Sequence, residues 1–590
     1  MSSDHQPART GEMYDYLIIG GGTAGCTLAS RLTEDPNVSV VLVEAGKDVT
    51  RENASADVLS NYPGKAYFNP DYTWRGLKAR LGGGRRNDPE AGRIARYEQA
   101  RLLGGGSTIN GLCANRGAPY DYDEWGRLGA TGWDWQTVLP YFRKLERDLN
   151  FSGDLHGTEG PIAISRFPKD DWTGFVRAVT TELDRQGYQF IEDQNGIWQD
   201  GYMPVTASVD ENGHRVSCAY AYLTSEVRSR RNLTVLTETL VERITFAGKE
   251  ATGAILRDGS GATRSVGARE TVLSCGTIHS PAMLMRSGVG PTSELSALGI
   301  ECIADRRGVG RNLIEHPVIS VSCLLDRSAR MHNPARHHTQ AHFRYSSGVE
   351  ECPEGDMSLA IIARSGWHAM GYRIGTLYVW VNKSYSQGSV RLSTGSADVE
   401  PVIDFRMLSD ERDMRRLREA FRYVVSLAQS ESVSRISSTA FPANYSDRVR
   451  RYSAPGLGNH VIMQIFASML DALPAMRPWL LKKFVTEGAT LSEIIRDDVV
   501  LENYLTNCVT GVWHPVGTCR MGEKNDPLAV TDSSGRVYGV NRLRVCDASL
   551  MPSIPCANTN LPTIMVAERM ADLIKNERAT ISNPNVVLAG

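Results

Sequence analysis

Residues 14–46 read YDYLIIGGGTAGCTLASRLTEDPNVSVVLVEAG, and this stretch decides the fold. An apolar strand at 14–19 runs into the glycine turn Gly20–Gly25. The following helix places Cys26, Leu28, Ala29 and Leu32 on one face. A second apolar strand at 38–43 ends at Glu44. This order of strand, G-x-G-x-x-G turn, helix, strand and acid predicts a Rossmann-type unit that binds a dinucleotide.

Each glycine of the turn has its own task. Gly20 permits the tight turn, Gly22 lets the backbone approach a pyrophosphate, and Gly25 lets the helix pack closely on the strand. The helix N-terminus at Thr23 and Ala24 offers free N–H groups and a positive dipole end to phosphates. Glu44, followed by Ala45, can accept the ribose hydroxyls of NAD or FAD equally well. The alternative is a glycine-rich turn in an unrelated α/β fold.

The composition sets outer limits. The chain has 590 residues, of which 41% are hydrophobic and 22% charged, so it supports a large core. A net charge of −2 calls for no nucleic acid. The polar residues 1–12 carry no secretory signal and no apolar run approaches 18 residues, which predicts a cytoplasmic protein without a transmembrane segment. The 11 cysteines include no C-x-x-C pair, which disfavours a disulfide framework.

Two further segments suit the same ligand. Residues 101–110, RLLGGGSTIN, allow close passage of backbone along a flat or anionic group, and a flexible surface loop is the alternative. A later strand at 270–274 passes through Cys275 and Gly276 into an apolar helix. Pro281 is expected in its first turn, and Gly288 is expected to end it. The chain thus returns to the nucleotide domain after a long excursion.

These segments resemble the glucose–methanol–choline (GMC) oxidoreductase family in the family's order, from about residue 14 to residue 573. The resemblance rests on residues 20–25, 44–46, 101–110, 276–290, 513–518, 545–547 and 558–563. It implies an α/β fold, α+β overall, with a Rossmann-type FAD-binding domain and a substrate domain built on an antiparallel sheet. The expected order is FAD binding at 14–170, a substrate excursion at 171–212, FAD binding at 213–319, substrate binding at 320–499 and FAD binding at 500–577.

The resemblance also implies FAD as the cofactor and assigns residues to it. Beyond the first motif these are Arg101, Gly104, Gly105, Ser107, Asn110, Val241, Cys275, Gly276, Trp513, Asp547, Ala548, Asn558, Thr559 and Thr563. Some relatives attach FAD through a histidine immediately before the asparagine of the 101–110 loop. Ile109 stands there and offers no nucleophile, so we predict non-covalent FAD. We expect Asp547 to lie near the ribityl chain or pyrophosphate of FAD. The alternative is that Asp547 is an ordinary helix cap.

Alcohol oxidation needs a base with a pKa near neutrality, and histidine is the best-matched side chain. His514, in Trp513-His-Pro-Val-Gly517, matches the family's active-site histidine, and Asn558 stands 44 residues later at its partner position. We expect Asn558 to donate to the substrate oxygen and activity to fall as acid protonates His514. A core histidine and a turn-forming asparagine are the alternatives. Thr563 is expected to open an apolar helix over 564–573 whose N-terminus can stabilise the reduced flavin.

On the substrate side, alternating patterns between 320 and 404 predict antiparallel strands. Trp380 and Trp513 are candidates for an aromatic wall that selects aryl or furanic alcohols, with plain core as the alternative. His337, His338 and His342 suggest a metal only weakly, because the segment is basic and loop-like and lacks a paired acid or Cys. We therefore predict no metal.

Residues 459–488 form an apolar insertion relative to similar chains. Spacings of three and four predict amphipathic helices broken by Pro474 and Pro478. They can pack on the domain or across a dimer contact, serve as a substrate lid, or touch a membrane surface.

The leading hypothesis is an oxidase of primary alcohols that passes electrons to O2 and yields hydrogen peroxide, working as a monomer or homodimer. A dehydrogenase with a quinone or other acceptor is the nearest rival. A cyanohydrin lyase with an idle flavin and a flavin-binding protein without catalysis are more distant.

Overall fold

The nucleotide-binding sheet forms as the 14–46 motif predicts. The structure, a computed structural model, describes residues 13–60, 62–83, 92–333, 337–443, 446–486 and 490–582, without the side chains of 581 and 582. Strand β1 pairs in parallel with β2 on one side and β12 on the other, and β9 and β23 extend this parallel core. A β10–β11–β12 meander completes the sheet. The strands are β1 (Met13–Ile19), β2 (Val40–Val43), β9 (Leu233–Leu236), β10 (Leu240–Ala247), β11 (Glu250–Arg257), β12 (Thr263–Leu273) and β23 (Leu543–Val545).

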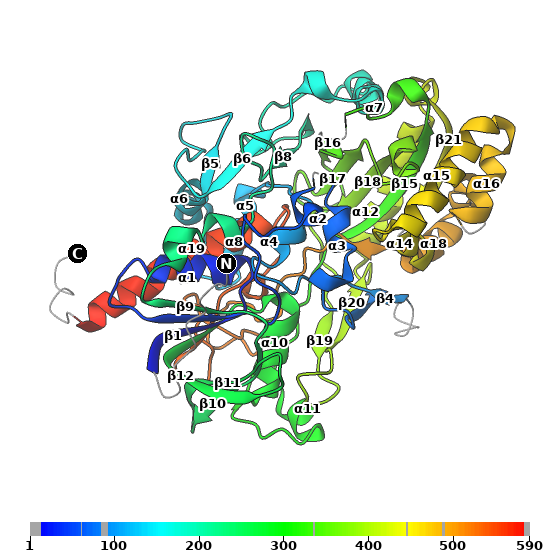
Figure 1. The fold of residues 1–590 in the computed structure, drawn as a ribbon. Helices are drawn as coiled ribbons and strands as arrows, with labels where there is room; N and C mark the ends of the chain where they lie inside the picture. Colours follow the sequence, from blue (N-terminus) through cyan, green and yellow to red (C-terminus); the bar gives the residue numbers. More distant parts are fainter. Residues whose placement is uncertain are drawn as a thin grey trace.

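Helices from opposite ends of the chain cover this sheet. Helix α1 (Thr23–Leu32) lies against α19 (Asn560–Ser582), which also contacts α6 (Trp135–Leu145) (Figure 1). Helix α10 (Gly276–Arg286) packs on β10. Their apolar residues share one core with the strands. The last segment of the chain therefore completes the domain that the first segment begins.

A second, antiparallel sheet stands beside the first (Figure 1). Its order is β21-β15-β18-β17-β16-β7, with β22 on β15, and α12 (Glu411–Gln429) packs on β15 and β18. The strands are β7 (Gly201–Pro204), β15 (Pro317–Leu325), β16 (Thr339–Tyr345), β17 (Met357–Ile362), β18 (Ile374–Val381), β21 (Ser437–Ala443) and β22 (Thr510–Gly511). The predicted antiparallel strands between 320 and 404 are confirmed.

Smaller sheets and helices complete the molecule. The minor strands are β3 (Lys78–Gly82), β4 (Ile94–Arg96), β5 (Glu146–Asp148), β6 (Ile162–Arg166), β8 (Thr206–Ala207), β13 (Val289–Gly290), β14 (Ala304–Asp305), β19 (Ser389–Arg391) and β20 (Val402–Met407). The further helices are α2 (Ala56–Leu59), α3 (Gly64–Tyr67), α4 (Gly106–Ile109), α5 (Pro119–Arg127), α7 (Gly174–Arg185), α8 (Cys218–Ala221), α9 (Ser225–Arg228), α11 (Thr292–Ala297), α13 (Glu431–Ser434), α14 (Asp447–Ser453), α15 (Leu457–Ala472), α16 (Arg477–Phe484), α17 (Leu491–Ile494) and α18 (Asp498–Cys508). None of the helices in the described residues combines the length and apolar character needed to cross a bilayer.

Three helix boundaries differ from the sequence prediction. Pro281 lies in the second turn of α10, because that helix already begins at Gly276. Helix α19 begins at Asn560, three residues before Thr563, and runs on to Ser582. Pro478 opens α16 instead of breaking a helix, whereas Pro474 does follow the end of α15. Proline fits a first turn since the N–H that it lacks has no partner there anyway. The last residues of the predicted insertion, 487 and 488, lie outside the described residues.

Candidate active site

One elongated cavity runs from the glycine turn after β1 to the antiparallel sheet, and its wall gathers residues from across the whole chain. The predicted site residues that line it are Gly20, Gly22, Thr23, Ala24, Glu44, Ala45, Gly105, Asn110, Val241, Cys275, Gly276, Trp380, Trp513, His514, Asp547, Ala548, Asn558, Thr559 and Thr563. They come from both sheets and from the C-terminal segment. The fold therefore joins motifs that the sequence separates by more than 500 residues.

Four other predicted residues contact this wall or pack next to it. A side chain at Gly25 would meet Gly20 O at 1.9 Å, and one at Gly104 would meet Thr108 Oγ1 at 2.3 Å. Ser107 Oγ donates to Gly104 O at 2.6 Å. The Arg101 guanidinium lies over Trp74, 4.7 Å from the ring centre. These residues shape the cavity without lining it.

The nucleotide end presents bare backbone. Gly22 caps α1 without a side-chain hydrogen bond, and a Cβ at Gly106 or Gly276 would meet nothing within 4 Å. The Glu44 carboxylate accepts Gly21 N at 2.8 Å and Gly46 N at 2.7 Å, and burial raises its pKa. A helix N-terminus with free N–H groups suits a pyrophosphate, and a fixed carboxylate suits a ribose. This donor set fits the adenosine diphosphate part of FAD.

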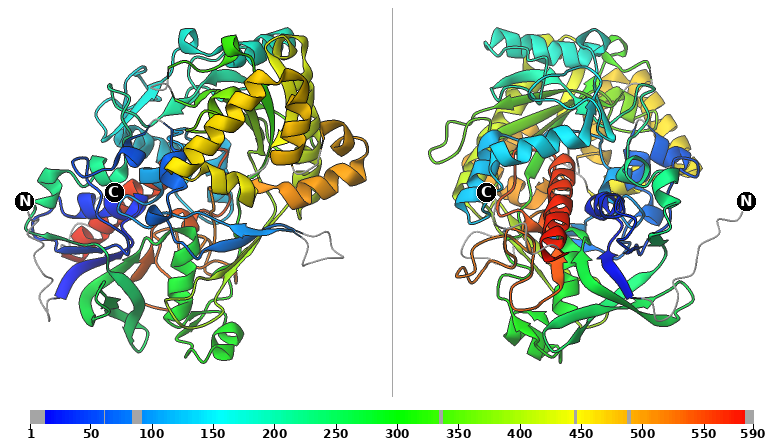
Figure 2. Two further views of the ribbon diagram at one scale, coloured as in Figure 1. Left: turned by 45° about the vertical axis from the view of Figure 1, so that its right-hand side comes forward. Right: turned by 90° about the vertical axis from the view of Figure 1, so that its left-hand side faces the viewer.

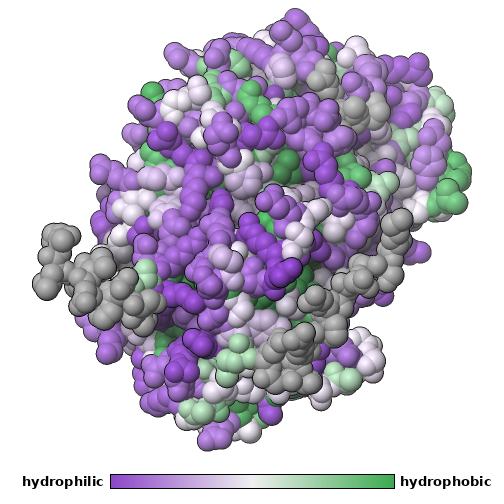
Figure 3. Space-filling model, turned by 60° about the vertical axis from the view of Figure 1, so that its left-hand side comes forward, coloured by the Kyte–Doolittle hydropathy of each residue, from purple (hydrophilic) through white to green (hydrophobic). Residues whose placement is uncertain are grey.

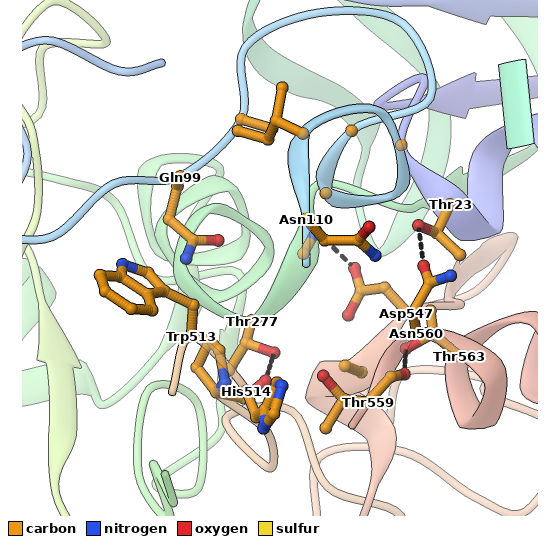
Figure 4. A pocket seen from close by; sticks show the side chains of 18 of the residues that line it. Thr23, Gln99, Asn110, Thr277, Trp513, His514, Asp547, Thr559, Asn560 and Thr563 are labelled. Carbon is orange, nitrogen blue, oxygen red and sulfur yellow. Dashed lines mark hydrogen bonds between the residues drawn. The ribbon is translucent and has the colours of Figure 1, made fainter. Parts of the chain in front are cut away.

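The two ends of the chain meet at the cavity, as Figure 4 shows. Thr23 Oγ1, at the start of α1, donates to Asn560 Oδ1 at 3.0 Å, at the start of α19. Thr563 Oγ1 donates back to Thr559 O at 2.7 Å. The first turns of both helices therefore face the same space, where their dipoles favour negative charge.

The Asp547 side chain joins its own segment to α10 by hydrogen bonds. Its carboxylate accepts Ser280 Oγ at 2.5 Å and Gly276 N at 2.9 Å, and it also accepts Ser549 N as the N-cap of a short 3₁₀ helix. Burial raises the pKa of Asp547. The capping alternative therefore describes part of its role, while the residue also lines the cavity.

The predicted catalytic pair lies together at the cavity wall. His514 Nε2 and Asn558 Nδ2 are 2.9 Å apart. Asn558 N in turn donates to Asn115 Oδ1 at 2.8 Å, and Asn558 Oδ1 is buried without a hydrogen-bond partner among the described residues. An unsatisfied polar atom beside a cavity is suited to contact a ligand.

The hydrogen bonds of His514 fix its tautomer. An amide nitrogen only donates, so Nε2 of His514 accepts and its proton sits on Nδ1. Nδ1 lies 3.1 Å from Nδ1 of His316, which is fully buried and accepts that proton. Burial, reinforced by the neighbouring His514, lowers the pKa of His316 well below its usual range. His514 therefore carries its lone pair on Nε2, the atom that faces Asn558 at the cavity wall.

A buried carboxylate holds the backbone at this histidine. Glu315 accepts His514 N at 2.8 and 2.9 Å, His316 N at 2.8 Å and the Tyr97 hydroxyl. Trp513, just before His514, has φ +61°, an uncommon conformation for a bulky residue. Burial raises the pKa of Glu315 to about 7 and lowers that of His514 to about 3. The lowered pKa of His514 shifts the expected acid limb to more acidic pH than the sequence analysis assumed, and this limb stays a prediction.

Pro281, in the second turn of α10, has a structural consequence. Its missing N–H leaves Thr277 O without an intrahelical donor, and Thr518 Oγ1 supplies one at 2.5 Å. Thr277 Oγ1 in turn donates to Pro515 O at 2.7 Å, as Figure 4 shows. The loop that carries His514 is therefore bonded on both sides to α10.

Comparison with known proteins decides the family. The GMC oxidoreductase family models match residues 14–318 and 384–567. The chain belongs to the GMC oxidoreductases. It is 40% identical to 5-(hydroxymethyl)furfural oxidase of Methylovorus sp. (strain MP688), over 96% of this chain and 99% of the relative. It is 31% identical to the mitochondrial choline dehydrogenase of Homo sapiens, over 96% and 90% of the two chains.

Solved structures agree with this assignment. Pyridoxine 4-oxidase from Mesorbium loti superposes with a TM-score of 0.78 at 25% identity, covering 95% of this chain and 99% of that one. A formate oxidase matches with a TM-score of 0.80 at 23% identity, over 97% and 100%, which shows a shared fold. This GMC oxidoreductase is thus an FAD-dependent enzyme that acts on CH–OH groups.

Aromatic and imidazole rings gather at the substrate end of this GMC oxidoreductase. Trp380 lies 6.2 Å from Tyr378 and 5.9 Å from His342, ring centre to ring centre, and its Nε1 donates to Asn382 Oδ1 at 3.1 Å. His342 belongs to β16 and is buried, so the prediction of a loop-like segment is wrong at this residue, whereas His337 and His338 precede the strand. Burial lowers the pKa of His342 to about 3. The lowered pKa favours an uncharged His342 ring beside the aromatic rings of Tyr378 and Trp380.

The sequence analysis did not identify Arg215, a buried cation near the cavity. Arg215 Nη1 donates to Asn110 Oδ1 at 2.9 Å and to Ser107 O at 3.3 Å, and Nε donates to Val58 O at 3.1 Å. Among the described residues it forms no ion pair, and burial lowers its pKa to about 10. Leu112 N also donates to Asn110 Oδ1, which leaves the Asn110 amide N–H groups free to face the cavity.

Proposed function

We propose that this enzyme oxidises a primary aryl or furanic alcohol to the aldehyde with non-covalently bound FAD, and that O2 is the electron acceptor. The observation that carries the proposal is the 2.9 Å contact between His514 Nε2 and Asn558 Nδ2 on the same cavity wall as the dinucleotide-binding glycines. An alcohol hydroxyl that replaces this hydrogen bond can donate to the base and accept from the amide, so that both groups hold its oxygen.

The protein's part of the reaction follows from this geometry. His514 Nε2 takes the hydroxyl proton, and His316 holds the imidazole in the tautomer that can accept it. Asn558 Nδ2 donates to the substrate oxygen as negative charge develops there. FAD, held by the glycine turn after β1 and by Glu44, would supply the hydride acceptor when bound, and its reoxidation by O2 would yield hydrogen peroxide.

Non-covalent binding is proposed from the residue at the attachment position. Ile109 lines the cavity and is buried, and its side chain cannot bond to a flavin carbon. Acid precipitation of the enzyme should leave all yellow colour in the supernatant. Flavin that remains with the denatured polypeptide would refute this part of the proposal.

The substrate class is proposed from the wall and from a relative. Tyr378, Trp380 and Trp513 line the cavity, and flat rings pack well on such side chains. The 40% identical relative is named for a furan alcohol. We expect benzylic and furanic alcohols to give a higher kcat/KM than choline, sugar or aliphatic alcohols. A preference for choline would contradict the aromatic assignment.

The acceptor separates the two leading functions. One relative is named a mitochondrial choline dehydrogenase, so dehydrogenation with another acceptor is the second candidate. Peroxide formed in step with aldehyde under air supports the oxidase, whereas turnover only with a quinone or dye supports the dehydrogenase. Bleaching of the flavin by alcohol under argon excludes a lyase with an idle flavin. A cytoplasmic location, a monomer or homodimer, the absence of a metal and the five segment boundaries stay predictions.

A further inference from the structure

The helices α15 and α16 expose an unusual amount of apolar surface. Seventeen large apolar side chains are exposed in the described residues, and nine of them fall between residues 457 and 484. The nine are Leu457, Val461, Ile462, Ile465, Met469, Leu473, Met476, Trp479 and Phe484. We call them the apolar surface. The view in Figure 3 shows the more usual pattern, in which hydrophilic residues dominate and hydrophobic ones are scattered.

This segment is firmly attached by its other face. Leu470, Leu480 and Leu481 pack in one cluster with residues of the antiparallel sheet. Asp471 bonds to Arg330 at 2.9 Å and Arg373 at 2.6 Å. The exposed residues therefore do not result from a detached helix. In Figure 2 the segment, gold to orange, lies on the outside of the molecule.

Helix periodicity puts the exposed residues of α15 on one stripe. Val461, Ile465 and Met469 follow one another at intervals of four and are 54%, 57% and 39% exposed. Ala467 and Leu470, on the opposite side, are fully buried. A helix that is apolar on both faces is normally covered on both, so the exposed stripe of α15 suggests a second apolar partner outside the fold.

The charge around the apolar surface points to that environment. Residues 446–486 contain six Arg and Lys and two Asp, a difference of +4, while the whole chain carries −2. Two of the six, Arg450 and Lys482, pair with Glu98 and Glu493 from outside this range. The basic residues are Arg448, Arg450, Arg451, Arg477, Lys482 and Lys483. Of the two acids, Asp471 is already held by two arginines. Lys483 Nζ lies 4.9 Å from the Trp479 ring centre, so a cation and an interfacial aromatic share one place.

We propose that the apolar surface docks on a membrane that contains acidic phospholipids, with α15 and α16 lying in the plane of its headgroups. An apolar face rimmed by Lys and Arg and carrying Trp is the composition that binds such an interface. A second copy of the chain fits less well, because a symmetric contact would bring two cationic surfaces together. Arg450, in the neighbouring helix α14, also pairs with Glu98, which lines the cavity. The segment that carries the apolar surface is therefore bonded to the cavity wall.

The test uses the full FAD-loaded enzyme and sedimentation with large vesicles. Vesicles of phosphatidylcholine and phosphatidylglycerol at 3:1 should bind the enzyme, vesicles of phosphatidylcholine alone should bind it more weakly, and salt should weaken the first kind of binding. The double variant Ile465→Ser/Trp479→Ser should lose at least about tenfold in affinity. Lys482→Glu/Lys483→Glu should lose affinity for the acidic vesicles selectively.

A matched control comes from elsewhere on the surface. Ile197 and Leu128 are 76% and 43% exposed outside the segment, so Ile197→Ser/Leu128→Ser should bind vesicles like the parent. All three double variants should keep the parent's alcohol oxidation in vesicle-free buffer. Absence of binding to the acidic vesicles would overturn the proposal. A dimer in ultracentrifugation that Ile465→Ser/Trp479→Ser dissociates, without vesicle binding by the parent, would assign the surface to a second copy instead.

Discussion

The nucleotide end and the His514 end of the cavity are built in opposite ways. At the nucleotide end the turn, the helix and Glu44 all fall within residues 14–46. At the other end His514 takes its geometry from Glu315, His316 and Asn558, which lie 44 to 199 residues away. A compact motif is stabilised by its own backbone bonds, whereas a dispersed site depends on the packing of several elements. Mutations should therefore affect binding at one end and catalysis at the other.

The largest effect is expected at the nucleotide end. Gly25→Val would place a Cβ 1.9 Å from Gly20 O and push α1 away from β1. We expect purified Gly25→Val protein to contain no FAD, measured as flavin absorbance per chain. Gly259→Val, at an exposed turn where a Cβ meets nothing within 4 Å, serves as the control and should keep one FAD. Full FAD content in Gly25→Val would mean that the motif does not hold the cofactor.

The next largest effect concerns the tautomer of His514. His316→Phe removes the acceptor of the His514 Nδ1 proton, so the imidazole can rotate or change tautomer. We expect flavin reduction to slow by about ten- to a hundredfold with FAD content unchanged. His316→Gln, whose amide oxygen can still accept, should recover part of the rate. Equal rates in His316→Phe and the parent would show that His316 does not position the His514 imidazole.

A smaller, pH-dependent effect is expected at Glu315. Burial raises the pKa of Glu315 from 4.5 to about 7, so its contribution to folding stability is complete below 4.5 and is lost as pH rises through 7. Above pH 7 the carboxylate is charged beside His514 and favours the imidazolium that forms there. The kcat/KM should therefore rise through pH 7. Glu315→Gln should flatten this limb, and a limb that survives in this variant would assign it to another group.

The smallest effect is expected at Thr518. Thr518→Val leaves Thr277 O without its donor and should lower the free energy of unfolding by about 1–3 kcal/mol. Because the loop keeps its bond from Thr277 to Pro515, kcat should change by less than about threefold. Denaturant unfolding and steady-state rates measure the two quantities. An unchanged unfolding midpoint would show that this bond is not needed.

The sequence predicted the local elements and missed what depends on long-range contact. The first strand, turn and helix follow from periodicity and glycine spacing, and all three are confirmed. Glu315 and His316 precede an apolar strand and look like an ordinary polar turn, because their partner His514 is distant in sequence. His342 was misjudged as part of a loop, since alternation on a strand buried on both faces shows no clear pattern. The sequence analysis placed Pro281 in a first turn, where proline needs no hydrogen-bond partner. It could not show that Thr518, distant in sequence, donates to the carbonyl that Pro281 leaves without a donor inside α10.

The most direct test is the anaerobic reduction of the flavin in His514→Ala by a benzylic or furanic alcohol. We expect this variant to bind one FAD per chain, as the parent does, and its reduction rate to fall by about two orders of magnitude or more. A near-parental reduction rate would contradict the assignment of His514 as the base, and a loss of FAD would contradict the separation of the two ends of the cavity.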